Sequence, residues 1–119
     1  MQKLKEDVYM KQIKAFVHQV RSAAVVEALR VAGVTNITLI DVKGTLKPLS
    51  EAEQDYSAGL GVATIPEVRI SLVCKDNDVE AITCVIRLAG RIGDDISGWV
   101  YVCPVDQAFP IGGPDSETD

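Results

Sequence analysis

Two segments of this chain carry apolar residues at helical spacing, and short runs rich in β-branched residues flank each of them. The first segment is predicted to be a helix over about 22–32, because Ser22 is a good N-cap and Gly33 suits a left-handed C-cap. Its predicted buried stripe is Val25, Val26, Ala28, Leu29 and Ala32.

The second helical segment begins at Asp76 or Asp78, either of which can cap it, and stops at Gly90. Its predicted stripe is Val79, Ile82, Val85, Ile86 and Ala89. The flanking runs are four predicted strands, at 12–20, 35–44, 67–74 and 98–105.

The order strand, helix, strand, strand, helix, strand is that of a split β-α-β repeat, so the expected fold class is α+β, a ferredoxin-like sandwich. Right-handed crossovers place both helices on one face of the sheet. The other face still carries Ile, Val, Leu and Trp side chains, which would leave an exposed apolar patch. Self-association over that face is therefore expected.

The composition restricts the partners and the compartment. With 119 residues the chain forms one domain, and its net charge of −5 argues against a nucleic-acid partner but not against a small anion. No apolar run approaches the ~20 residues that cross a bilayer. The mixed charge of MQKLKEDVYM is unlike a secretory signal, so a cytoplasmic protein is expected, without membrane insertion.

The connection between the second and third predicted strands, Thr45 to Ile65, is far longer than a hairpin needs. Acidic residues indicate a solvated segment, and Pro48, Gly59 and Gly61 indicate an irregular one. A short helix over 50–58 is an alternative, since Ser50 and Glu53 form a capping box. Long loops on compact domains commonly bind partners or ligands, and this is the preferred interpretation.

The cysteines and the single histidine give little support for catalysis or metal binding. Cys74, Cys84 and Cys103 lie in apolar stretches without a C-x-x-C pair, so buried reduced thiols are expected. His18 has no partner at ligand spacing and is expected to be an ordinary surface residue. A metal carrier or a small hydrolase is therefore disfavoured, and neither catalytic nor metal-binding residues are predicted.

The chain resembles the PII signal-transduction superfamily over roughly residues 10–111. The resemblance rests on the helix ending AGVT, on DVKG before the long loop, on Pro66 ahead of VRISLVC, and on GRIGDD followed by GWVYVCPV. It makes residues 1–9 an N-terminal extension, residues 10–111 the domain, 45–65 its T-loop, and 112–119 a flexible tail.

The resemblance implies a homotrimer with nucleotide sites in the clefts between subunits. Each site is framed by the base of the T-loop, by the B-loop (Gly90 to Asp95) and by the C-terminal segment of a neighbour. The nucleotide-binding residues carried over are Thr38, Gly44, Thr45, Leu46, Lys47, Gly90, Arg91, Ile92, Gly93 and Asp94. Glycines let main-chain N–H groups approach phosphate, and Arg91 and Lys47 add positive charge.

Several positions depart from the nitrogen-sensing members of the superfamily. The loop glutamine that helps to hold Mg-ATP and 2-oxoglutarate becomes Pro48, and the uridylylated tyrosine becomes Leu60, leaving Tyr56 out of place. A loop-closing lysine becomes Glu67, Ser97-Gly98 stands in place of the B-loop lysine, and Pro110 and Gly112 replace C-terminal basic residues. Losing several charge-assisted contacts weakens the binding of a triphosphate, so ADP or AMP is favoured over ATP.

The segment DDISGWVYVC is similar to the strand in carboxysome-associated and bicarbonate-related PII-like proteins. That likeness implies a regulator of inorganic-carbon metabolism that binds adenine nucleotide, with bicarbonate as a candidate second ligand at Lys47 and Arg91. The T-loop would dock on a target transporter or enzyme. The alternative is a nitrogen-regulatory PII protein that binds ATP and 2-oxoglutarate. Either regulator has no catalytic cofactor.

Overall fold

The computed structural model describes residues 10–46, 48, 55–57 and 62–113. The strands are β1 (Met10–His18), β2 (Thr38–Gly44), β3 (Asp55–Ser57), β4 (Val62–Lys75) and β5 (Gly98–Val105). The α-helices are α1 (Gln19–Val31) and α2 (Val79–Ala89), with the 3₁₀ turn η3 (Asp76–Asp78) before α2.

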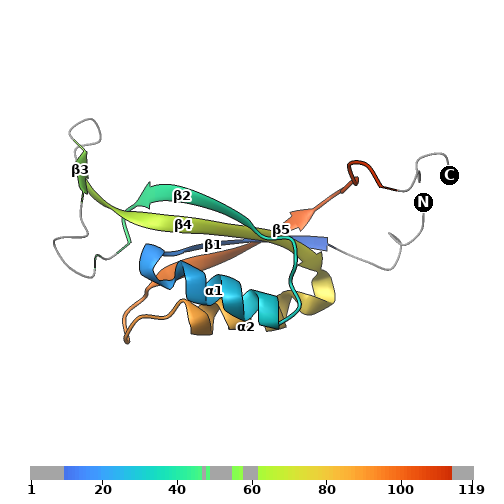
Figure 1. Cartoon of the computed structure of the whole chain (residues 1–119), viewed down its shortest axis with the longest axis horizontal. Coiled ribbons are helices and arrows are strands. Elements are labelled where there is room, and N and C mark those ends of the chain that lie inside the picture. The colour runs from blue at the N-terminus through green and yellow to red at the C-terminus, as the bar shows by residue number, and fades with distance from the viewer. Residues whose placement is uncertain (1–9, 47, 49–54, 58–61, 114–119) are drawn as a thin grey trace.

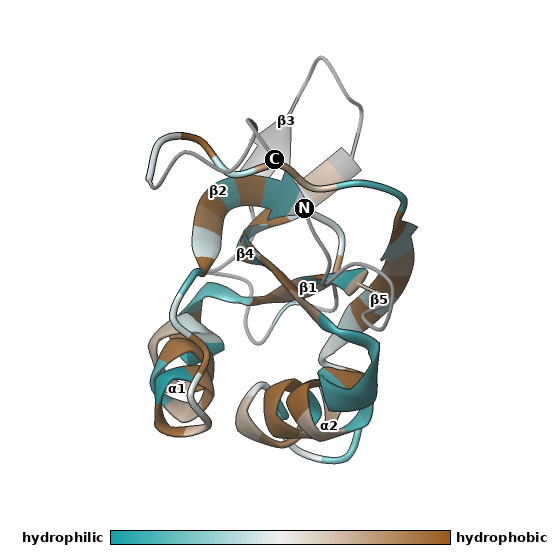
Figure 2. Cartoon of the chain, turned by 90° about the vertical axis from the view of Figure 1, so that its right-hand side faces the viewer, coloured by the Kyte–Doolittle hydropathy of each residue, from teal (hydrophilic) through white to brown (hydrophobic). Residues whose placement is uncertain are grey.

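The main sheet is antiparallel throughout, in the order β2-β4-β1-β5, with β3 paired to β4. Both α-helices lie on the same face of the sheet (Figure 1), side by side beneath it (Figure 2). This is the ferredoxin-like α+β fold that the order of the elements predicts.

The core lies between the sheet and the two helices. The central strands β1 and β4 alternate, so that every second residue points at the helices. The cluster of buried residues is Ile13, Ala15, Val17, Val25, Leu29, Val68, Ile70, Leu72, Cys74, Ile82 and Ile86. Both predicted helix stripes therefore contribute to the core, although Ala32 itself is exposed at the end of α1.

The first strand and helix are displaced from their predicted bounds. Helix α1 begins at Gln19, three residues before Ser22, and the Ser22 hydroxyl donates to the Gln19 carbonyl inside the helix rather than capping it. The prediction missed this because Val20 looks like a strand residue but is exposed on α1. The end of α1 was predicted correctly, since Gly33 has φ 96° and Val34 N–H donates to Leu29 O in a Schellman motif.

The third predicted strand is longer than the alternation indicated. Strand β4 begins at Val62, and it passes through Pro66, which pairs with Lys43 of β2. The strand tolerates this proline because β1 ends opposite Glu67, so β4 is paired on one side only at Pro66. The last four residues of the T-loop as predicted are thus strand.

The helix considered over 50–58 is wrong at Asp55–Ser57, which form β3 and pair with Val62–Thr64. The neighbouring positions 49–54 and 58–61, Leu60 among them, lie outside the described residues. Figure 1 shows β3 beyond the end of β2 and beside the first residues of β4, at the end of the sheet away from the start of β1.

The other elements follow the prediction closely. Strand β5 matches 98–105, and β2 begins at Thr38 rather than at Thr35. Asp78 is the residue before α2, although its side chain makes no capping hydrogen bond, and Gly90 is the C-cap. The extension 1–9 and the end of the tail, 114–119, lie outside the described residues.

The sheet face that the helices leave uncovered, called here the open face, is partly apolar. The strand registers place four large exposed side chains on it, Ile40, Val73, Trp99 and Tyr101. Phe16 contacts Tyr101 edge to face, with ring centroids 6.1 Å apart. Arg69 also lies on this face, and its Nε is buried without a hydrogen-bond partner among the described residues.

The predictions for histidine and cysteine need correction. His18 is buried, because it ends the central strand β1 directly opposite Glu67. Cys84 is exposed and Cys103 is half-buried, while Cys74 is buried, and all three are free thiols. Burial, followed by the negative charges of Asp78 and Asp76, raises the pKa of the Cys74 thiol.

Neither a membrane-spanning helix nor a metal-binding cluster occurs in the described ranges. No helix there is both long and apolar enough to span a membrane. Among those residues, no group of three or more His, Cys, Asp or Glu side chains could hold a metal ion.

Candidate functional site

One end of the sheet carries most of the predicted site residues. Gly44 ends β2 opposite Ile65, His18 ends β1 opposite Glu67, and Gly98 begins β5 opposite Val17. The T-loop base (Gly44–Leu46) and the B-loop, which precedes β5, therefore lie at the same end, the end that carries β3 in Figure 1. Three strand spacings separate them, roughly 14 Å.

Thr38 lies at the opposite end of the same strand. It pairs with Ser71, and six residues separate it from Gly44, which corresponds to roughly 20 Å along β2. A cavity of about 400 Å³ lies between the α1–β2 connection, the end of β4 and helix α2, and Thr38 does not line it. A single chain thus brings the T-loop base and the B-loop to one end of the sheet and leaves Thr38 apart from them.

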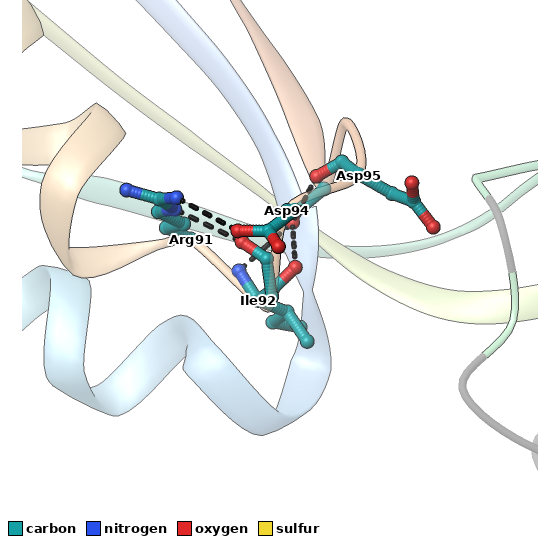
Figure 3. Close-up of polar contacts among 6 residues, drawn as sticks. Arg91, Ile92, Asp94 and Asp95 are labelled. Atoms are coloured by element: carbon teal, nitrogen blue, oxygen red, sulfur yellow. Dashed lines mark hydrogen bonds and ion pairs between the residues drawn. The ribbon is translucent and has the colours of Figure 1, made fainter.

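The B-loop is closed on itself by Arg91. The Arg91 Nε donates to the Gly93 carbonyl at 2.9 Å, and its Nη2 lies 3.2 Å from Asp94 Oδ1 (Figure 3). The Arg91 side chain is nevertheless 61% exposed, and that of Asp94 is fully exposed. Arg91 can therefore reach an incoming anion, in competition with its bonds inside the loop.

Ser97 closes the other half of the B-loop. Its hydroxyl oxygen accepts from Ile92 N–H at 2.8 Å and donates to the carbonyl of Ile92 or Asp95. The main-chain N–H of Ile92, one of the predicted nucleotide-binding residues, is therefore already bound (Figure 3). The sequence prediction treated Ser97 only as a missing lysine and overlooked this role.

The T-loop base is held by Glu67. Its Oε2 accepts from Leu46 N–H at 3.0 Å, and a Cβ on Gly44 would overlap the same carboxylate. Gly44 is thus required so that the Glu67 side chain can lie close to the main chain. The sequence prediction had instead expected this glycine to let a phosphate approach. Thr45 is exposed and Leu46 half-buried, while Lys47 lies outside the described residues.

Arg21 is a further contributor that the sequence did not reveal. Its Nε and Nη2 both donate to the Ala89 carbonyl, at 2.9 and 2.6 Å, and so tie the start of α1 to the end of α2 just before the B-loop. The C-terminal carbonyls of a helix favour such a cation. No signal in the sequence indicated this role, because the helix was predicted to begin at Ser22, whereas Arg21 lies in the first turn of the observed α1.

Comparison with known proteins identifies the family. The family model described as "Nitrogen regulatory protein P-II" matches residues 10–112. A nitrogen regulatory protein P-II of Cereibacter sphaeroides is 33% identical over 102 residues, covering 86% of this chain and 91% of that protein. One of Bradyrhizobium diazoefficiens is 34% identical over 113 residues, covering 92% and 98%.

A solved structure agrees with this result. The crystal structure of Arabidopsis thaliana PII bound to citrate matches with a TM-score of 0.64 and 25% identity, covering 82% of this chain and 78% of that one. The family match defines the class of the chain, that of signalling and regulatory proteins. The chain belongs to the P-II family.

Proposed function

We propose that this P-II family member senses adenine nucleotide in clefts between identical subunits and signals through its T-loop. The placement of Thr38 supports this proposal most directly. It lies roughly 20 Å from the T-loop base, so one nucleotide cannot contact both within a single chain. A second copy, packed beside the first, would bring its Thr38 end against the T-loop base and B-loop.

A homotrimer built on the open face is the assembly we propose. The family consists of trimeric regulators, and Ile40, Val73, Trp99 and Tyr101 provide apolar area that a neighbour would bury. The buried Arg69 Nε would also gain an acceptor there, which would remove the cost of leaving a polar atom unpaired.

The B-loop favours ADP or AMP over ATP. Arg91 supplies its positive charge, and Asp94 offsets part of that charge. A diphosphate or monophosphate requires fewer cations than a triphosphate, and Ile92 N–H becomes available only if Ser97 releases it. We therefore keep Gly90, Arg91, Ile92, Gly93 and Asp94, with the T-loop base, as the proposed nucleotide contacts.

The second ligand and the target are proposed from resemblance. Bicarbonate would bind beside the nucleotide at Arg91 and Lys47, and the T-loop would dock on a transporter or enzyme of inorganic-carbon metabolism in the cytoplasm. No catalytic activity is expected. The names of the relatives favour a second function, nitrogen regulation with ATP and 2-oxoglutarate, and the bound citrate of the Arabidopsis protein adds weight to a carboxylate ligand.

Thermal unfolding with AMP, ADP or ATP, each with and without bicarbonate, and with ATP, magnesium and 2-oxoglutarate, separates the two functions. A ligand at 100 times its dissociation constant adds about 2.7 kcal/mol to the free energy of unfolding. Stabilisation by ADP or AMP is expected. Stabilisation by ATP only in the presence of 2-oxoglutarate would establish the alternative instead.

Arg91→Ala is expected to weaken ADP binding about tenfold to a hundredfold, because it removes a charge-assisted contact. Isothermal titration measures the affinity. Arg87→Ala is the matched control, since Arg87 is exposed on α2 outside the B-loop and its loss changes the net charge equally. Equal affinities of the two variants would show that the B-loop does not hold phosphate.

A further inference from the structure

The Glu67 side chain is a buried carboxylate at the T-loop base. Glu67 is only 4% exposed, and its Oε2 binds Leu46 N–H. The carboxylate also lies over the Cα of Gly44, in space that any larger residue at position 44 would need. A buried carboxylate requires donors of this kind, and here the donor belongs to the main chain of the loop.

The position of Glu67 is set by the sheet rather than by the loop. Strand β4 pairs with β1 and β2 at this residue, which places His18 and Val42 directly opposite Glu67. Buried His18 closes one side, and Gly44 closes the other. The strands of the sheet therefore place the carboxylate beside Leu46.

A main-chain N–H beside a glycine is a suitable donor for a free carboxylate ligand. Here the donor of Leu46 is bound by a carboxylate of the chain itself, and the space over Gly44 is filled. A free carboxylate entering this place would have to displace Glu67 and would then lie beside its negative charge. Both effects oppose binding.

We propose that Glu67 determines specificity, because it acts as an internal carboxylate that excludes free di- and tricarboxylates from the T-loop base. This inference deepens the proposed function, and it rests on the proposal that the T-loop base borders the nucleotide cleft. A purely structural tether would have no effect on the choice of ligand. The site would accordingly respond to the nucleotide alone or with a smaller anion.

The test is isothermal titration of the whole chain with 2-oxoglutarate and, separately, with citrate, in the presence and absence of ADP. Glu67→Ala frees Leu46 N–H, and Glu67→Lys also places a cation there, so both are expected to bind 2-oxoglutarate at least about tenfold more tightly than the unchanged protein. Glu67→Gln keeps an acceptor for Leu46, and its gain is expected to fall below that of Glu67→Ala. Glu80→Lys, on the exposed surface of α2, is the control for net charge.

Tighter binding of carboxylates without tighter binding of ADP would support exclusion, because general loosening of the loop would weaken the binding of both ligands. The inference is overturned if folded Glu67→Ala binds 2-oxoglutarate no more tightly than the unchanged protein does. Should Glu67→Lys fail to fold, Glu67→Ala and Glu67→Gln still decide the question. ADP titration of the unchanged protein tests the proposed function separately, and carboxylate binding without ADP tests the inference even if ADP does not bind.

Discussion

At the scale of single residues, Ser97 shows how a small polar side chain organises a ligand loop. One hydroxyl binds the amide of Ile92 and reaches the carbonyls of Ile92 and Asp95. The B-loop therefore has a defined closed form before any ligand arrives. The energy of these bonds must be exceeded by the phosphate contacts that replace them.

Ser97→Ala is expected to lower the free energy of unfolding by about 1–2 kcal/mol, because it removes these hydrogen bonds from a half-buried loop. Amide hydrogen exchange at Ile92 is expected to accelerate, since its N–H loses its acceptor. Chemical denaturation and exchange measured by NMR provide the two readings. Ser97→Thr retains the hydroxyl and serves as the control, and unchanged exchange in Ser97→Ala would contradict the assigned contact.

At the scale of elements, the junction of β5 with β1 depends on a close approach of two backbones. Gly98 begins β5, and a Cβ at this position would overlap the main-chain carbonyl oxygen of Phe16. Strand β1 cannot move away, because it is paired with β4 on its other side. This contact fixes where β5 begins and hence where the B-loop ends.

Gly98→Ala is expected to destabilise the protein by about 1–3 kcal/mol through overpacking against a fixed backbone. Urea denaturation gives the free energy of unfolding. Gln107→Ala is the control, since Gln107 is exposed just beyond β5. A change of less than about 0.5 kcal/mol in Gly98→Ala, as is usual for exposed sites, would show that the start of β5 can shift freely.

At the scale of the whole molecule, the uneven covering of the sheet is the main feature. The helices bury the central part of one face, where Ile13, Ala15 and Ile70 are fully buried, whereas Trp99 is 52% exposed and Tyr101 49% exposed on the open face. A regulator with its nucleotide sites between subunits needs that face to assemble. Assembly and ligand binding are therefore coupled in the proposed function.

Trp99→Glu is expected to convert the proposed trimer to monomers, because a charge would be buried in an apolar contact. Sedimentation equilibrium or light scattering measures the mass. Leu88→Glu is the matched control, since Leu88 is 68% exposed on α2, on the helix side of the sheet. A trimer that survives Trp99→Glu would place the interface elsewhere, and loss of ADP binding in the monomer would support a site shared between subunits.

Local patterns were sufficient for most of the fold and for only part of the candidate site. The bounds of β5, the end of α1 at Gly33 and the stop of α2 at Gly90 follow from short-range signals. The start of α1 was missed because Val20 is equally suited to a strand. The extension of β4 to Val62 was missed because Pro66 normally excludes a central strand.

The sequence by itself determined the order and type of β1, α1, β2, β4, α2 and β5, because periodicity and capping depend on neighbours within a few positions. Only the tertiary structure decided which residues meet at the T-loop base. His18, Glu67 and Gly44 are distant along the chain, and the registers of β1, β2 and β4 bring them together. Strand register depends on contacts across the whole sheet, so the burial of His18 and the internal carboxylate of Glu67 could not be predicted from local patterns.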